Sequence, residues 1–274
     1  MMSDTIVTNN VARDDVLRPI VEAKKAEGVD LKLQDMACCV KTSSGVISNC
    51  VFTGNSSFGL FYTLSVGSST KVDHCLFDGN VGLSIDYTGT MWGGVIGGGE
   101  YNTIRNCQVT RNRWEAPAGL CGTLFFSSGA NGNHVENCTI CDNTAVPVST
   151  QYGVGPYLTG KESCWIVNSV CLGNKYTSND KEWNLHLGNN AVQSNCYTTV
   201  ATAADYKDPK FRDRANGDYR LRRTSPLRDA GQKLDWMTEG SLDLAGQGRV
   251  NGENPDIGCY EYWWYSTGIL LFVR

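Results

Sequence analysis

Four charged residues have the chemistry of proton transfer and anion binding. Arg105, Arg113 and Glu115 lie within one short stretch, and His186 follows further along the chain. Arginine holds a carboxylate through two parallel hydrogen bonds. Histidine and glutamate are common general acids and bases. If the protein is catalytic, these four residues are the candidates, and the sequence alone does not bring them together.

Aromatic residues form a second set with possible binding chemistry. A flat ring covers the apolar face of a sugar and leaves its polar edge for hydroxyl groups. The alternative for each ring is core packing beneath a long loop. A glycosidase would also need two carboxylates about 5–9.5 Å apart, which no sequence pattern reveals. The candidate substrate-binding residues are Trp92, Trp114, Tyr152, Tyr157 and Trp183.

One stretch mimics a metal site. His134, Glu136, Cys138 and Cys141 follow the order seen in zinc-dependent deaminases. Residues three apart in a strand point to opposite faces, so Cys138 and Cys141 would diverge. A tetrahedral zinc site needs converging ligands. We therefore predict no metal site.

The elements that must position these residues come from an internal repeat. The nine residues Ile47–Asn55 recur as Val72–Asn80, Ile104–Asn112, Val135–Asn143 and Ile166–Asn174. The steps between copies are 25, 32, 31 and 31 residues. Such a period is typical of solenoids, in which each unit buries its apolar face against the next.

Each copy predicts two short strands joined by a bend. Apolar residues occupy its first, fourth and sixth positions, except that Ser169 takes the fourth position of the last copy, and the third position holds Asn49, His74, Asn106, Asn137 or Asn168. Asparagine tolerates the left-handed backbone conformation that a one-residue bend requires. Stacking the copies about 4.8 Å apart gives columns of like side chains, including an asparagine ladder. The sequence therefore predicts an all-β, right-handed parallel β-helix of about six coils.

Third strands are predicted between the copies, at 60–64, 94–96, 122–126, 156–158 and 184–187. The loops before them vary in length and carry most of the candidate aromatic residues. Asp73, Arg105 and Glu136 share one outward column, which is either a surface charge ladder or a row of acid and base groups.

This repeat resembles the right-handed parallel β-helix proteins of the pectin-lyase-like superfamily. The resemblance covers roughly Val40 to Cys196. It implies a substrate groove beside the third strands. It leaves the activity open, because the superfamily includes polysaccharide lyases, glycoside hydrolases, phage tailspikes and bacterial surface proteins. The lyases use a basic side chain as base and neutralise the sugar carboxylate with arginine or calcium, so a lyase here would have calcium as a possible cofactor.

The C-terminal part has no copy of the repeat. Its segments Asp208–Phe211, Gly217–Leu221, Ser225–Gly231 and Asp256–Glu261 resemble those that end many exported bacterial β-helix proteins. The resemblance implies an irregular cap that closes the stack. Within it, Asp229, Asp243 and Asp256 are expected to cap turns and pair with Arg249 rather than bind a cation. We predict one structural domain, with a lead-in or N-terminal cap at 1–40, the β-helix at 41–200 and the cap at 201–274.

Composition excludes several classes of partner. The net charge is −4 without a basic run, which argues against nucleic acid. No stretch is long and apolar enough to span a bilayer, and the first residues lack a signal peptide. Stacked parallel columns hold Cβ atoms farther apart than a disulfide requires, so we expect most of the twelve cysteines to be free thiols.

These features favour an exported bacterial module at the cell surface or outside the cell, structural or binding a polysaccharide or surface glycan. The alternatives are a polysaccharide lyase or glycoside hydrolase, and an adhesin or phage-tail-type fibre. The chain itself is expected to be a fragment of a longer secreted protein or to start late.

Overall fold

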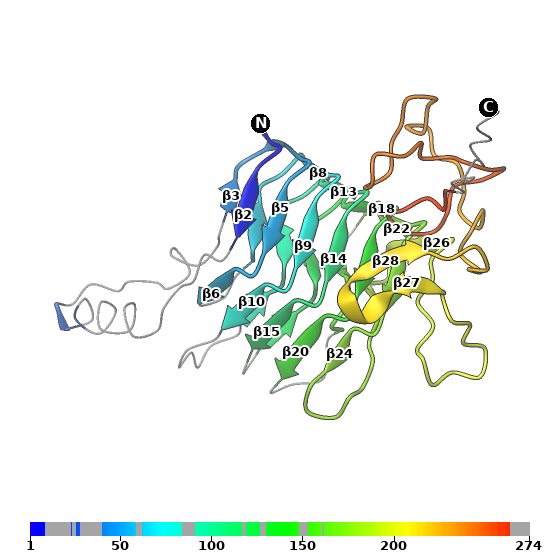
Figure 1. Ribbon diagram of the computed structural model, residues 1–274. Coiled ribbons are helices and arrows are strands. Elements are labelled where there is room, and N and C mark those ends of the chain that lie inside the picture. Colours follow the sequence, from blue (N-terminus) through cyan, green and yellow to red (C-terminus); the bar gives the residue numbers. More distant parts are fainter. Residues whose placement is uncertain are drawn as a thin grey trace, which may run out of the picture.

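The chain folds as a parallel β-helix, which confirms the predicted all-β fold (Figure 1). The computed structural model describes residues 1–8, 23, 26–27, 40–58, 62–83, 91–116, 119–126, 130–147, 153–160 and 162–263. Four sheets, here named A to D, run along the stack, so a coil has four strands rather than the three predicted. Within the described ranges, no helix is long and apolar enough to cross a membrane.

Sheets A and B contain the two strands of each repeat copy. Sheet A has seven strands in the order β1 (Met2–Ser3), β4 (Gly45–Ser48), β8 (Thr70–Asp73), β13 (Thr103–Arg105), β18 (His134–Glu136), β22 (Cys164–Val167) and β26 (Ala191–Ser194). Sheet B has six strands in the order β2 (Ile6–Thr8), β5 (Val51–Thr53), β9 (Leu76–Asp78), β14 (Gln108–Thr110), β19 (Thr139–Cys141) and β23 (Val170–Leu172).

Sheets C and D complete each coil. Sheet C, which the sequence did not predict, has five strands, β6 (Ser56–Phe58), β10 (Val81–Leu83), β15 (Arg113–Ala116), β20 (Thr144–Pro147) and β24 (Lys175–Tyr176). Sheet D, formed by the predicted third strands, has six, β3 (Val40–Thr42), β7 (Leu64–Val66), β12 (Ile96–Gly98), β17 (Leu124–Phe126), β21 (Tyr157–Leu158) and β25 (His186–Leu187). A separate pair joins β11 (Met91–Gly93) to β16 (Gly119–Cys121).

The first residues of the chain already belong to the sheets. Strands β1 and β2 pair in parallel with β4 and β5. The sheets therefore begin before the predicted boundary at residue 41. The parts 9–22 and 28–39 of the predicted lead-in lie outside the described residues.

The bend within each copy has the predicted left-handed backbone. The φ values are +52° at Asn49, +54° at His74, +48° at Asn106, +49° at Asn137 and +50° at Asn168. A second left-handed residue closes each copy. These closing residues are Gly54, Gly79, Arg111, Asp142 and Gly173.

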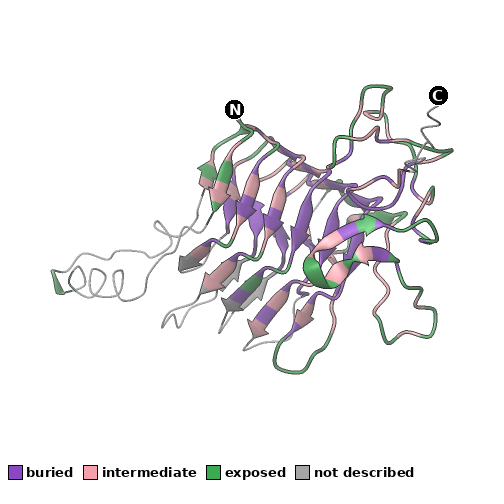
Figure 2. Cartoon of the chain, viewed as in Figure 1, coloured by how far each residue is buried: buried purple, intermediate pink, exposed green. Residues whose placement is uncertain are grey.

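The predicted apolar columns form the interior of the stack (Figure 2). Phe52 and Phe77 stack with their ring centroids 4.5 Å apart, as expected for adjacent coils. Each fully buried apolar side chain contributes roughly 1.5–3 kcal/mol. The column residues, each at most 3 % exposed, are Ile47, Val72, Ile104, Val135, Ile166, Cys50, Cys75, Cys107, Cys138, Phe52, Phe77, Val109, Ile140 and Cys171.

A continuous asparagine ladder follows sheet B, through Asn55, Asn80, Asn112, Asn143 and Asn174. In each step, the Nδ2 group of one asparagine donates to Oδ1 of the next, at 2.8–2.9 Å. The same Oδ1 accepts the backbone N–H of the preceding asparagine, at 2.9–3.2 Å. The second Nδ2 hydrogen goes to a backbone carbonyl of an earlier coil. The side-chain amides of the inner asparagines, Asn80, Asn112 and Asn143, are thus fully paired, as their burial demands.

The asparagines at the first bend do not form such a ladder, contrary to what equivalent stacking suggested. Asn168 reaches Asn137 at 3.4 Å, whereas Asn106 donates to Asp73 at 3.3 Å. His74 interrupts this column, and the C-terminal segment folds over it. Apart from the Asn168–Asn137 contact, its amides therefore bond to the cap.

The interior cysteines are free thiols. Cys50, Cys75, Cys107 and Cys138 each donate Sγ–H to the carbonyl two residues earlier, at 3.0–3.3 Å. They act as small buried side chains with a weak donor. Nine cysteines are free within the part of the chain that the structure describes.

We expect thiol titration of the denatured, unreduced protein to detect at least nine of the twelve cysteines. The same reagent should leave the four column thiols of the folded protein unmodified, because they are fully buried. A sample reduced before denaturation provides the reference count. Fewer than nine thiols in the unreduced sample would contradict the free column.

The C-terminal segment lies along the side of the stack (Figure 1). The sequence had instead predicted that it closes the end of the stack. The antiparallel hairpin of β27 (Phe211–Asp213), the 3-10 turn η2 (Arg214–Asn216) and β28 (Asp218–Leu221) packs on the outer face of sheet B. There it covers Cys141, Val170 and Leu172. Arg214 forms an ion pair with Asp142, and Tyr219 donates a 2.7 Å hydrogen bond to the same carboxylate.

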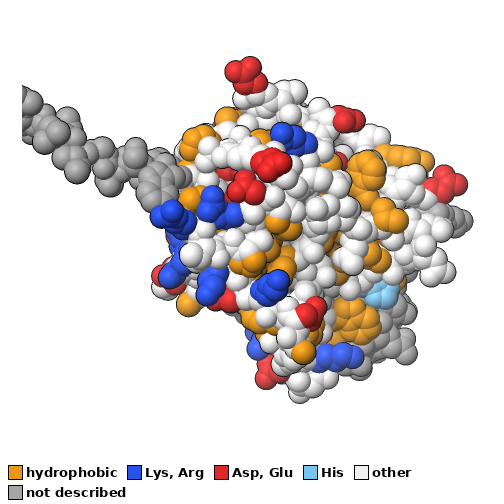
Figure 3. All heavy atoms as spheres, turned by 90° about the vertical axis from the view of Figure 1, so that its right-hand side faces the viewer, with side chains coloured by type: hydrophobic (Ala, Val, Ile, Leu, Met, Phe, Trp, Pro, Cys, Tyr) orange, Lys and Arg blue, Asp and Glu red, His pale blue; other side chains and the backbone are white. Residues whose placement is uncertain are grey.

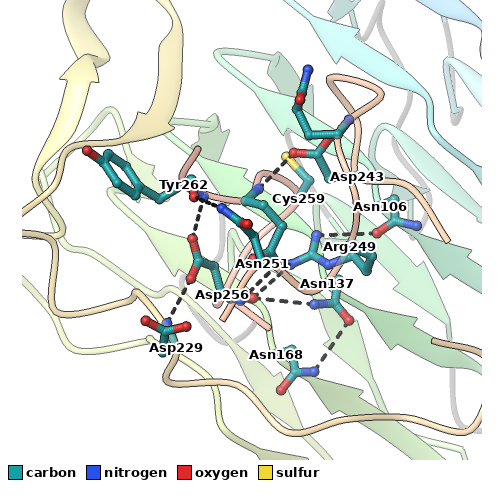
Figure 4. Close-up of polar contacts among 12 residues, drawn as sticks. Asn106, Asn137, Asn168, Asp229, Asp243, Arg249, Asn251, Asp256, Cys259 and Tyr262 are labelled. Atoms are coloured by element: carbon teal, nitrogen blue, oxygen red, sulfur yellow. Dashed lines mark hydrogen bonds and ion pairs between the residues drawn. The ribbon is translucent and has the colours of Figure 1, made fainter. Parts of the chain in front are cut away.

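A buried charged cluster fixes this cap (Figure 4). Arg249, 1 % exposed, pairs with Glu261 at 2.6 Å and donates to the carbonyl of Asp256 at 2.8 Å. It also approaches Asn106 of the β-helix at 3.5 Å. Asp243 accepts the backbone N–H groups of three residues, the turn-capping role predicted for it. Arg249, however, pairs with Glu261 rather than with the three aspartates.

Three buried carboxyl groups near a single guanidinium, which pairs only with Glu261, make stability depend on pH. Burial raises the pKa of Glu261 to about 8, against the opposing effect of Arg249, and burial raises the pKa of Asp256 to about 6. The folded state therefore binds more protons than the unfolded state above about pH 4.5. This stabilisation is complete below that pH and is lost as the pH rises through 8. Among the histidines, the raised pKa of His74 acts in the same direction and the lowered pKa values of His134 and His186 oppose it.

We expect the free energy of unfolding to fall between pH 5.5 and 8.5, with a slope of up to about 1.4 kcal/mol per pH unit for each proton released. Urea denaturation at three pH values measures it. Glu261→Gln should flatten the dependence. A stability that rises with pH over this range would refute the assignment.

Candidate functional site: an aromatic pocket at the last coil

A row of stacked rings lies on the outer side of sheet D. The register places Phe125, Tyr157 and His186 side by side on β17, β21 and β25. Ring centroids are 5.0 Å apart between Phe125 and Tyr157 and 4.5 Å between Tyr157 and His186. Phe125 and Tyr157 are only 1 % and 8 % exposed. The row therefore presents little ring surface until it reaches the last coil.

Trp183 continues this row and borders a pocket. Its ring lies 5.8 Å from that of His186, and the ammonium group of Lys181 lies 5.0 Å from the ring centroid. The indole packs against Gly153, where an added Cβ would come within 2.9 Å of Cδ1. Trp183 is half-buried and partly packed on the core. The contacts with Gly153 and His186 thus fix the Trp183 ring and leave part of it accessible.

The pocket has a volume of about 450 Å³, within the range of small-ligand sites. Leu185 and Leu187 of the last coil give it an apolar wall. Figure 3 faces this end of the molecule, where hydrophobic side chains lie among polar ones. Its lining consists of Lys181, Glu182, Trp183, Asn184, Leu185, Leu187, Gln193, Thr198 and Val200.

The polar groups of the pocket are held by the chain around it. Asn184 is buried and accepts the backbone N–H of Asn174 at 3.0 Å, which anchors the segment to the ladder. Glu182 accepts hydrogen bonds from Asn184 and from the backbone of Ala201, each at 3.2 Å. Beside the pocket, burial lowers the pKa of His186. The site offers an aromatic surface with donors and acceptors at its edges.

The predicted catalytic residues do not come together. Arg105, on sheet A, pairs with Glu136 at 3.1 Å and lies under the Trp236 ring, 4.1 Å from its centroid. Arg113 is exposed on sheet C, and His186 lies on sheet D. The side chain of Glu115 lies outside the described residues. The charged column that contains Arg105 is therefore covered by the cap rather than open to a substrate.

The aromatic residues predicted to bind substrate also lie apart from one another. Trp114 points into the core and is 4 % exposed, so its prediction as a substrate contact was wrong. The reason is strand β15, which turns a presumed loop into part of sheet C. Tyr157 is mostly buried within its stack. Tyr152 and the side chain of Trp92 lie outside the described residues, which leaves Trp183 as the predicted ring at a pocket.

The residues of the zinc-like pattern lie in different parts of the fold. Cys138 lies in the interior core, and Cys141 lies in the second core under the hairpin. His134 stacks on the outward Trp165 ring, with centroids 4.1 Å apart. In the ranges that the structure describes, no group of three His, Cys, Asp or Glu residues is placed to hold a metal ion.

Most of the pocket residues carry no signal in the sequence. Gln193, Thr198 and Val200 follow the five copies of the repeat, and only the position of this segment at the end of the stack brings them to Trp183. No protein-family model matches the chain, and no curated protein is significantly similar to it in sequence.

Proposed function

We propose that this protein is a non-catalytic glycan-binding module at the bacterial cell surface, related to the pectin-lyase-like β-helix proteins. The parallel β-helix and the repeat support the relationship. The proposed binding site is the pocket at the last coil. The observation that carries the proposal is the half-buried Trp183 ring beside polar groups from Lys181, Glu182 and Gln193.

The chemistry of this pocket suits a neutral sugar. The indole face would cover the apolar face of the ring, and the surrounding side chains would bond its hydroxyl groups. A lyase is less well supported, because Arg105, Arg113 and His186 lie on three different sheets. A structural or adhesin role does not depend on sugar binding in the pocket. A measurement of sugar binding therefore separates these alternatives.

Calorimetric titration with neutral plant, algal and host oligosaccharides tests the proposal. We expect weak binding that Trp183→Ala reduces roughly tenfold or more, equivalent to about 1.4 kcal/mol. Gln193→Ala, at an exposed pocket residue, should reduce it without affecting the core. The matched control is Trp165→Ala, because Trp165 is 41 % exposed and also contacts a histidine ring, but does not line the pocket.

Three outcomes would contradict the proposal. Absorbance from unsaturated products would indicate a lyase. Equal losses for Trp183→Ala and Trp165→Ala would show that the pocket is not the site. If no glycan binds, the structural or adhesin role remains.

A further inference from the structure

A second pocket lies within the cap, separate from the last coil. Its volume is about 430 Å³, and three segments of the cap contribute to it. The lining residues are Arg223, Arg228, Asn251, Tyr262 and Trp263. Two arginines and two aromatic rings in a single pocket differ from the mixed lining of the Trp183 site.

Arg228 is held in place with much of its donor capacity unused. Its guanidinium carbon lies 4.2 Å from the centroid of the Tyr262 ring, and one Nη group donates to the carbonyl of Arg223 at 2.7 Å. The other Nη group lies 3.9 Å from the Asp229 carboxylate, beyond hydrogen-bond distance. Nε has no partner among the described residues. Five N–H donors are available on an arginine, and a stacked, fixed guanidinium loses less entropy when it binds an anion.

The buried carboxyl group of Asp256 holds the two sides of this pocket together (Figure 4). One oxygen accepts the backbone N–H of Asp229, next to Arg228, at 2.7 Å, and the other accepts that of Tyr262 at 2.6 Å. Asn251 donates to the carbonyl of Tyr262 at 3.0 Å. One carboxyl group therefore sets the position of the Arg228–Tyr262 pair.

The backbone conformation at Asp229 and its close contact with Gly252 fix the position of the Asp229 carboxylate. Asp229 takes a left-handed conformation, with φ +53°. Its carboxylate fits against Gly252, where an added Cβ would lie 1.9 Å from Oδ1. This arrangement keeps the Asp229 carboxylate in a long ion pair with Arg228, at 3.9 Å. The guanidinium is thereby partly neutralised but not saturated.

We propose that this cap pocket binds a small organic anion about the size of one sugar ring. Arg228 would hold its carboxylate, sulfate or phosphate group, with Arg223 adding positive charge, and the Tyr262 and Trp263 rings would cover its apolar body. The site is independent of the proposed glycan pocket, because the two share no lining residue.

Calorimetry with matched single sugars tests the proposal on the whole chain. The probes are galacturonate, galactose 6-sulfate and galactose 6-phosphate, with galactose as the neutral match. We expect at least one charged probe to bind and galactose to bind at least tenfold more weakly. The ranking of the charged probes distinguishes a carboxylate from a sulfate or phosphate ligand. Binding of galactose equal to that of the charged probes, or no binding of any of them, would overturn the proposal.

Variants then locate the site. Arg228→Lys keeps the charge but removes the planar fork, and should weaken the charged probe roughly tenfold. Arg220→Lys is the matched control, because Arg220 pairs with Asp218 on the exposed hairpin. Trp183→Ala should leave this binding unchanged, which separates it from the glycan pocket. Equal affinity in Arg228→Lys and wild type would refute the site, and the comparison of charged with neutral probes decides the matter even if a variant unfolds.

Discussion

Asn143→Ala is expected to lower the free energy of unfolding on the order of 3 kcal/mol. The Asn143 side chain accepts the backbone N–H of Asn112 at 3.0 Å and its Nδ2 group at 2.9 Å. It also donates to the carbonyl of Val109 and to Asn174. Alanine would leave two buried donors of Asn112 unpaired, and each unpaired group costs about 1–3 kcal/mol.

Asn49→Ala provides the matched control. Asn49 is exposed and has a left-handed backbone, so its replacement costs only the conformational preference, roughly 1–2 kcal/mol. Urea denaturation followed by far-ultraviolet circular dichroism measures both variants. If Asn143→Ala costs no more than Asn49→Ala, the ladder does not stabilise the stack as inferred.

Arg249→Met is expected to destabilise the protein by about 3–5 kcal/mol at pH 8, because it removes one partner of a buried ion pair. Glu261 would remain buried without its cation, beside Asp243 and Asp256. At pH 5 the cost should be smaller. Without the guanidinium the pKa values of these carboxyl groups rise further, so protonation can neutralise them.

The control for this substitution is Arg220→Met, which removes the exposed pair with Asp218. An exposed pair contributes about 0–1 kcal/mol. Denaturation at both pH values compares the variants. Equal effects of the two substitutions, or an Arg249→Met cost that does not change with pH, would contradict the role of the buried cluster.

Local patterns predicted the repeat unit well. The left-handed bend at Asn106 and the interior position of Cys107 follow from one copy read against the others. The ladder was present in the sequence as an unbroken column through Asn112 and Asn143. The first-bend column was the poorer choice, since His74 already interrupts it.

The fourth strand was missed for a physical reason. The segments that form β10 and β15 share no apolar pattern, because Gly82 and Trp114 fill the same inward position with very different volumes. Parallel pairing of the backbone, rather than side-chain type, defines that sheet. Trp114 was therefore assigned to an outer loop when it is part of the core.

The cap and both pockets depend on contacts across long sequence separations. Tyr260 donates to Gln108 at 2.9 Å, and the backbone of Cys259 donates to Thr139 at 3.1 Å. Neither residue pair has a local signal. The sequence could identify Arg249 and Asp256 as linked, but not that the segment would lie against the side of the coils and create a pocket there.

The way the asparagine ladder ends has a consequence for the length of the molecule. The backbone N–H of Asn174 is not paired with an asparagine one full repeat later. Its acceptor is the side chain of Asn184, only ten residues on, at 3.0 Å. Asn184 thus acts as a terminator that replaces the next repeat. Duplicating a whole inner coil would extend the molecule and repeat the ladder contacts of Asn80, Asn112 and Asn143. A coil appended after Leu187 would instead have to displace Asn184. We therefore expect insertions of whole coils to be tolerated within the ladder and not after it.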